Sequence, residues 1–113
     1  MYTFFYRPFF EYEFIKVPKF LFDHEEFKGM SSNAILLYSA LLDRSSLSAK
    51  NKWRDSLGRI FVNYTMREAC DFLKCSLPTA VKTFKEIEEL GLIERKKDKK
   101  GGADRIFVKI CID

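Results

Sequence analysis

The sequence predicts a single α+β domain in which helices are followed by a two-stranded β-hairpin. Apolar residues recur at helical spacing in separate runs between residues 32 and 90. After Gly91 the pattern changes to two short alternating stretches on either side of a polar turn at 98–103. With 113 residues, the chain fits one domain and leaves little room for a second.

Residues 1–17 predict an aromatic arm or strand that precedes the domain at 18–113. The stretch from Tyr12 to Ile15 alternates, and Pro18 suits the start of a helical turn through Phe22. The arm holds too many aromatic side chains for one small core, and an exposed apolar patch of this kind usually marks an interface. A strand that covers the core is the alternative. The candidate dimer contact comprises Phe4, Phe5, Tyr6, Phe9, Phe10 and Tyr12.

A long amphipathic helix is expected next, with Ser31 or Ser32 as its N-cap. Its core stripe is Ala34, Leu37, Tyr38, Leu41 and Leu42. Residues 53–64 then predict a β-hairpin, because Trp53 and the apolar run at 60–62 flank turn residues that include Gly58.

Two short helices with a tight turn between them follow. Thr65 and Glu68 form a capping-box pattern for the first helix. The pattern breaks at Cys75 and restarts at Ser76, a second N-cap, and Pro78 fits the first turn of the new helix. Gly91 ends that helix, whose buried face is expected to be Ala80, Phe84 and Ile87. Two helices of this kind before a basic hairpin predict a winged helix-turn-helix fold.

The positive charge of the chain is concentrated near its C-terminus. Residues 95–109 hold seven basic and two acidic residues, a net of +5, whereas the remaining thirteen basic and fourteen acidic residues give −1. A local basic patch is the expected footprint of a polyanion, although a solvated charged loop has the same composition.

The second helix of the pair is expected to enter a DNA major groove. Lys82 can donate to guanine or to a phosphate, Thr79 or Thr83 can bond to either, and Leu77 can touch a thymine methyl or simply pack. Glu86 and Glu88 are expected to point away from DNA. The candidate recognition residues are Ser76, Leu77, Pro78, Thr79, Lys82, Thr83 and Lys85.

The hairpin is expected to act as a wing that lies on the phosphate backbone or reaches into the minor groove, and its backbone contacts contribute affinity and orientation. If about five of its charges meet phosphates, log K should fall with log salt at a slope of roughly −4 to −5. The candidate wing residues are Arg95, Lys96, Lys97, Lys99, Lys100 and Arg105.

Other function classes find little support in the sequence. No catalytic triad, nucleotide-binding glycine loop or metal cluster is recognisable, so we expect neither an enzyme, a cofactor nor a metal. His24 is expected to be a solvated surface residue. The three cysteines have no paired spacing, which favours reduced thiols in the cytoplasm. No apolar run is long enough for a membrane span.

Several segments of the sequence match a known family when they are taken together. The more specific segments are LLYSALLDRSSLS (36–48) and KNKW (50–53), whereas ELGLIER (89–95) occurs in many winged helices. The remaining matching segments are FIKVPKFLF (14–22), KGMS (28–31), DSLGRIFV (55–62), YT (64–65), LKCS (73–76), KEIEELGLIERK (85–96) and RIFVK (105–109). Over about residues 13–110, the chain resembles the N-terminal domain of the RepA_N family of plasmid replication initiators.

The resemblance implies binding of double-stranded DNA at repeated, iteron-like sites in a plasmid origin, usually as a homodimer. It also implies a separate C-terminal domain that contacts host replication proteins, so we expect the N-terminal part of a longer initiator, or a short paralogue. Two departures bear on base preference and wing contacts. The recognition helix begins with Leu77–Pro78, where family members are often polar and basic, and the wing tip is GGADR in place of GKPNR.

Two alternatives remain at this point. A winged-helix transcriptional regulator would use the same surface, and only the family resemblance favours replication over it. A protein-interaction module whose basic wing binds an acidic partner is the third possibility.

Overall fold

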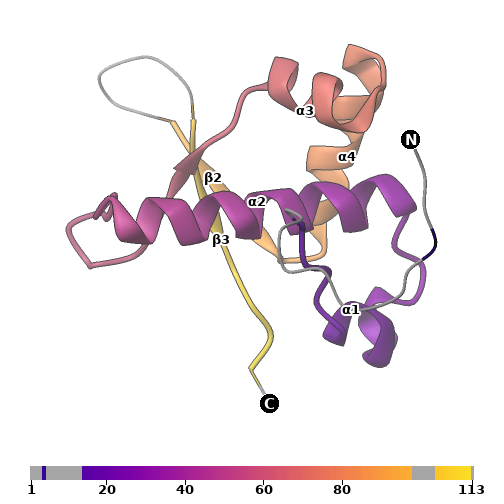
Figure 1. Ribbon diagram of the computed structural model, residues 1–113, viewed down its shortest axis with the longest axis horizontal. Coiled ribbons are helices and arrows are strands. Elements are labelled where there is room, and N and C mark those ends of the chain that lie inside the picture. Colours follow the sequence, from indigo (N-terminus) through magenta and orange to yellow (C-terminus); the bar gives the residue numbers. More distant parts are fainter. Residues whose placement is uncertain (1–3, 5–13, 98–103, 113) are drawn as a thin grey trace.

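The computed structural model describes residue 4, residues 14–97 and residues 104–112. Its elements occur in the order expected for a winged helix-turn-helix, and the predicted α+β fold class is confirmed. They are α1 (Phe20–Asp23), a 3-10 turn η1 (Glu25–Phe27), α2 (Ser32–Lys50), β1 (Val62–Asn63), α3 (Met66–Leu73), α4 (Leu77–Glu89), β2 (Ile93–Lys96) and β3 (Arg105–Val108). Figure 1 shows the long α2 crossing the molecule, with α3 and α4 gathered on one side of it.

Each main helix begins where its sequence offers a cap. The Ser31 hydroxyl accepts from the Ala34 amide at 3.1 Å, and the Thr65 hydroxyl accepts from the Glu68 amide at 3.0 Å. The chain reverses between α3 and α4 at Lys74, which has a left-handed backbone with φ 52°. Gly91, with φ 79°, follows α4 in the conformation that glycine adopts most readily.

Three strands form one antiparallel sheet in the order β1-β3-β2. Ile106 of β3 is paired with Val62 on one side and with Arg95 on the other. The last strand of the sequence is therefore the central strand, and the base of the wing is hydrogen-bonded on both sides.

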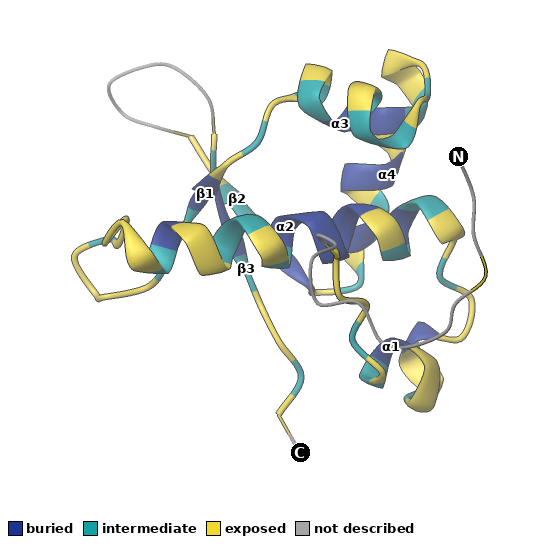
Figure 2. Cartoon of the chain, in the orientation of Figure 1, coloured by how far each residue is buried: buried dark blue, intermediate teal, exposed yellow. Residues whose placement is uncertain are grey.

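The core lies where α2 packs against α3, α4 and the sheet. Tyr38 is fully buried there, as predicted, and its hydroxyl donates to the Lys109 carbonyl at 2.5 Å. Figure 2 shows the buried face of α2 turned toward α4 and the strands. The buried residues of this core are Leu21, Phe27, Ala34, Leu37, Tyr38, Leu41, Val62, Ala69, Ala80, Phe84, Ile87, Leu92, Ile93 and Ile106.

Two local expectations are met only in part. The hairpin predicted at 53–64 is short: an isolated antiparallel bridge joins Arg54 to Ile60, and β1, which follows it, pairs with β3. Residues 14–17 are not a strand, and the side chains of Phe14, Ile15 and Val17 are exposed, so this described part of the arm is irregular.

Candidate nucleic-acid interface

Helix α4 is held by its apolar face, which leaves its opposite face exposed. Ala80, Phe84 and Ile87 are buried against the core, and α4 packs on α2, α3 and β2. The exposed positions are Ser76, Leu77, Pro78, Val81, Lys82, Lys85 and Glu89, and Thr79 is half-buried. Five of the seven predicted recognition residues therefore lie on the open face, with a sixth at its edge.

Thr83 is the exception, and its place on the predicted reading face is wrong. The residue is only 4% exposed, and its hydroxyl donates to the Thr79 carbonyl at 2.7 Å. Helical geometry explains the difference, because Thr83 immediately precedes the buried Phe84 and follows the buried Ala80 by three positions. Val81 has the exposure that the sequence interpretation gave to Thr83.

The residues at the start of α4, from Ser76 to Pro78, are exposed. Ser76 has the extended backbone of an N-cap, and its hydroxyl lies 3.1 Å from the hydroxyl of Thr79. Amides in the first turn of a helix have no intrahelical acceptor, and the helix dipole favours an anion near them. This end of α4 can therefore receive a phosphate oxygen.

Two of the acidic residues of α4, Glu86 and Glu88, are bonded within the protein, in accord with the prediction that they point away from DNA, whereas Glu89 is exposed. Glu86 accepts from the amide of Ser31 at 2.8 Å and from its hydroxyl at 2.7 Å. Glu88 forms an ion pair with Arg95 at 2.8 Å. Two carboxylates that would repel phosphate are thus held by other groups.

Arg95 differs from the free cation that the sequence suggested. Its guanidinium makes two hydrogen bonds to Glu88 and lies 5.5 Å from the centre of the Phe84 ring. The bond from Arg95 lowers the pKa of Glu88, and the same bond raises the pKa of Arg95. Because its charge is paired with Glu88, Arg95 serves to join β2 to α4.

The other described wing cations are more accessible. Lys96 and Lys97 are exposed at the end of β2, and Arg105 begins β3 as the partner of Lys96. The guanidinium of Arg105 lies 4.5 Å from the centre of the Phe61 ring. Lys99 and Lys100 lie outside the described residues.

A cavity of about 300 Å³ lies between the base of the wing and the helix pair. Its lining residues are Tyr64, Thr65, Met66, Phe84, Arg95, Asp104 and Ile106. This lining places the base of the wing beside the start of α3.

The sequence interpretation missed the cations of the loop at 52–54. Lys52 and Arg54 line a cavity of about 380 Å³ together with Arg105. The available signal was the pair of basic residues on either side of the exposed Trp53. The predicted hairpin gave no indication that this loop would lie next to the wing.

His24 is not the solvated residue that the sequence suggested. Its Nδ1 lies 3.6 Å from the Cys111 sulfur and 3.9 Å from a Glu26 carboxylate oxygen. The ligand atoms of these three residues lie within 4.8 Å of one another, so a thiol, an imidazole and a carboxylate that could hold a transition-metal ion meet here.

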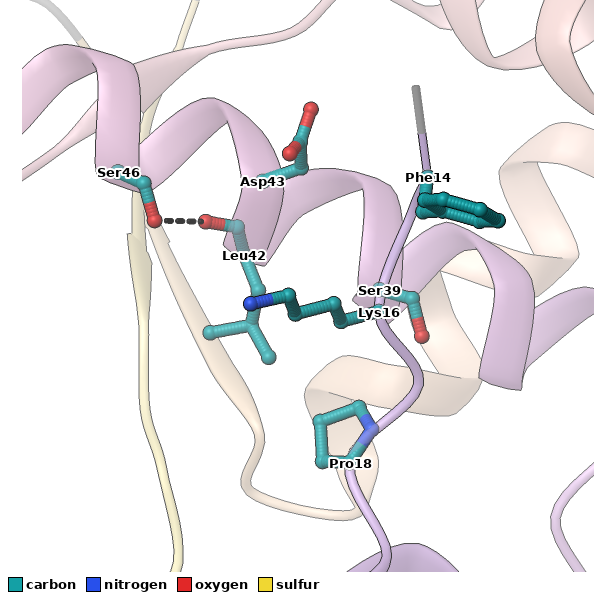
Figure 3. A pocket seen from close by; sticks show the side chains of 7 residues that line it. All are labelled: Phe14, Lys16, Pro18, Ser39, Leu42, Asp43 and Ser46. Carbon is teal, nitrogen blue, oxygen red and sulfur yellow. Dashed lines mark hydrogen bonds between the residues drawn. The ribbon is translucent and has the colours of Figure 1, made fainter. Parts of the chain in front are cut away.

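The described end of the arm lies against α2. Figure 3 shows Phe14, Lys16 and Pro18 facing Ser39, Leu42, Asp43 and Ser46 across a cavity of about 360 Å³. Phe4 is described and is 81% exposed. The other candidate dimer residues (Phe5, Tyr6, Phe9, Phe10 and Tyr12) lie outside the described residues.

Comparison with known proteins gives a consistent result. The family model "Replication initiator protein A (RepA) N-terminus" matches residues 13–112. Three solved structures cover 89% of this chain: "N-Terminal domain of DNA binding protein" (28% identity, TM-score 0.77, 77% of that chain), "Structure of Rep-DNA complex" (28%, 0.76, 78%) and "Structure of MDR initiator" (30%, 0.74, 80%).

A curated relative is longer than this chain. A "41 kDa protein" from Lactobacillus helveticus is 26% identical over 101 residues, which are 84% of this chain and 29% of the relative. The chain thus corresponds to less than a third of that relative's length. Among the described residues, no helix is long and apolar enough to cross a membrane.

Proposed function

Because the chain belongs to the RepA_N family of replication initiator N-terminal domains, we propose that it binds double-stranded DNA at a plasmid replication origin. One observation carries this proposal. The exposed face of α4 lies beside a basic wing, and the acidic residues Glu86 and Glu88 are both bonded within the protein. The likeness to a Rep protein solved with DNA adds support.

The face of α4 is suited to reading bases. The major groove is wide enough for an α-helix, and Lys82 can donate to the guanine acceptors there. Leu77 and Val81 are large exposed apolar residues, 56% and 42% exposed, on the same helix. An apolar side chain in the major groove discriminates by touching a thymine methyl, so we infer that the site is rich in thymine near the N-terminus of α4.

The wing is suited to binding the phosphate backbone of DNA. Lys96, Lys97 and Arg105 lie together at the end of the sheet, and backbone contacts fix orientation without reading sequence. Without Arg95, five of the six proposed wing charges remain, namely four lysines and Arg105. If these five meet phosphates, we expect a salt slope of roughly −4 to −5.

Selection of bound sites from random duplex DNA, followed by footprinting on the plasmid that encodes the chain, tests the proposal. Repeated sites within the initiator gene are the expected result, and a single upstream operator would favour a transcriptional regulator instead. In anisotropy titrations, Lys82→Ala should weaken binding about tenfold. The matched control is Lys19→Ala, an exposed lysine beside α1. Equal affinity for all duplexes, or no effect of Lys82→Ala, would contradict the proposal.

The finer assignments follow from the family and from the aromatic arm. We propose that the domain acts as a homodimer in the cytoplasm, with the arm at or near the contact, and that a C-terminal region contacts host replication proteins. Light scattering of the chain with and without residues 1–13 tests the first part. Loss of the dimer on deletion is expected, and an unchanged mass would remove the arm from the interface.

A further inference from the structure

We propose that the loop at 52–54 and the outer face of the sheet form a second DNA-backbone contact beside the wing. The site, called here the outer patch, takes phosphodiester groups of the duplex that flanks the recognition site, and it rests on the DNA binding proposed above. The outer patch consists of Lys52, Trp53, Arg54, Phe61, Asn63 and Arg105.

The composition of the outer patch is selective for an anion. The six residues line a shallow, open cavity of about 380 Å³, and they include three cations and no carboxylate. Lys52 and Arg54 are exposed, and one guanidinium nitrogen of Arg54 donates to the Gly58 carbonyl at 2.8 Å. An arginine held in this way still has other N–H groups to donate.

The nearby carboxylates are engaged or turned away. Asp55 is paired with Arg59 at 2.8 Å, and Glu94 is paired with Lys109 at 3.1 Å. Asp104 and Arg95 both line the cavity between the base of the wing and the helix pair, which lies on the opposite side of the sheet from the outer patch. The cations of the outer patch therefore keep their excess charge.

A cluster of aromatic rings packs against these cations. The ring of Trp53 is stacked on that of Phe61, with 6.5 Å between the ring centroids. The centroids of the Phe61 and Phe107 rings are 5.9 Å apart. The guanidinium of Arg105 lies over Phe61, and the ammonium of Lys96 lies 5.6 Å from the centre of the Phe107 ring. Phe107 is buried but is not part of the main core, so these aromatic rings form a separate cluster on the outer face of the sheet.

Strand register joins the outer patch to the wing. Arg105 is paired with Asn63 on one side and with Lys96 on the other, so the three residues lie side by side across the sheet. Lys97 follows Lys96 directly after the end of β2 and is exposed. A backbone that lies on Lys96 and Lys97 would reach Arg105 and then the loop at 52–54.

The occupant we assign is the duplex backbone rather than a single strand. The contact with the wing fixes the polyanion as the one bound by α4, and three cations around one cavity suit phosphates. Trp53 is 47% exposed and can lie against a deoxyribose, which requires no unpaired base. The outer patch thus extends the footprint beyond the bases read by α4.

Trp53 is the single tryptophan of the chain, so its fluorescence reports directly on the outer patch. We would titrate the protein with a short duplex limited to the selected site, with the same site extended by about one helical turn at each end, and with single strands of the extended sequence. The expected result is tighter binding and a change of tryptophan emission with the extended duplex alone.

The variant for this test is Lys52→Gln with Arg54→Gln, and its control is Lys19→Gln with Lys28→Gln, which removes the same charge near α1. The outer-patch variant should bind the short duplex like the parent protein and lose the advantage of the extended duplex. Its salt slope on the extended duplex should be smaller by roughly 2, and that of the control unchanged.

The outcomes separate the two proposals. No site-specific binding of any duplex by the parent protein overturns the function and this inference with it. Specific binding with equal slopes for the outer-patch and control variants overturns the outer patch alone. A tryptophan response to single strands only also overturns it, because the ligand would then be unpaired DNA.

Discussion

Glu88 accepts two hydrogen bonds from the guanidinium of Arg95, from Nε at 3.2 Å and from Nη2 at 2.8 Å. This contact joins the last turn of α4 to β2, the first strand of the wing. The angle between the candidate recognition helix and the wing is therefore held by an ion pair as well as by the core.

Glu88→Gln should lower the free energy of unfolding by about 1 kcal/mol, since the pair is partly exposed. Because Arg95 lowers the folded-state pKa of Glu88, this stability is present above the unfolded pKa of about 4.3 and is lost as pH falls through the folded value. Urea denaturation from pH 3 to pH 7 should show the two proteins converging at low pH.

Glu88→Gln should also tighten DNA binding at low salt, because it releases the Arg95 charge beside the wing. Glu89→Gln is the matched control, since Glu89 is exposed on the same helix. Equal effects of the two substitutions on affinity and stability would contradict the role of the pair.

Alanine substitutions at Thr79 and Thr83 should have different effects, one on DNA affinity and the other on folding stability. Thr83→Ala removes a buried hydroxyl that bonds to the Thr79 carbonyl, and we expect a loss of about 1 kcal/mol in stability with unchanged affinity for the folded protein. Thr79→Ala should instead weaken DNA binding. Denaturation and anisotropy on both variants provide the measurement, and the reverse pattern would show that Thr83 contacts DNA.

Ser31 should matter more than its exposed position suggests. Its hydroxyl caps α2, and both its amide and its hydroxyl donate to Glu86 of α4. We expect Ser31→Ala to cost about 1–2 kcal/mol, because a cap and a charged hydrogen bond are lost together. Ser32→Ala is the control in thermal denaturation, and it should have a smaller effect than Ser31→Ala.

Tyr38→Phe should cost about 1–2 kcal/mol at neutral pH, since the Lys109 carbonyl loses its donor. Burial, with a smaller contribution from Cys111, raises the pKa of Tyr38 above its usual range. The neutral phenol thus stabilises the fold below the unfolded pKa of about 10, and this stability is lost as pH rises further. The difference between the two proteins should shrink above pH 10, and a constant difference would contradict the buried hydrogen bond.

The sequence predicts the helices well because their signals are local. Ser31, Thr65 and Ser76 each precede a run with helical spacing, and all three occupy N-cap positions. Gly91 follows α4 as expected, in a conformation that few other residues adopt readily.

The sequence could not predict which polar side chains find partners far away in the chain. Arg95 looked like one more wing cation, and only the packing of β2 on α4 brings it to Glu88. His24 and Cys111 are far apart in the sequence, and their contact depends on the path of the chain after β3. Thr83 is a different case, because its place three positions after the buried Ala80 and directly before the buried Phe84 was already visible in the sequence.

The position of β3 in the centre of the sheet has a consequence for synthesis on the ribosome. β1 and β2 do not pair with each other, so a nascent chain that lacks residues 105–108 contains two strands with no sheet. Ile106 also belongs to the core, which therefore cannot close before β3 arrives. Binding competence should accordingly appear late during translation, once nearly all of the domain has left the exit tunnel.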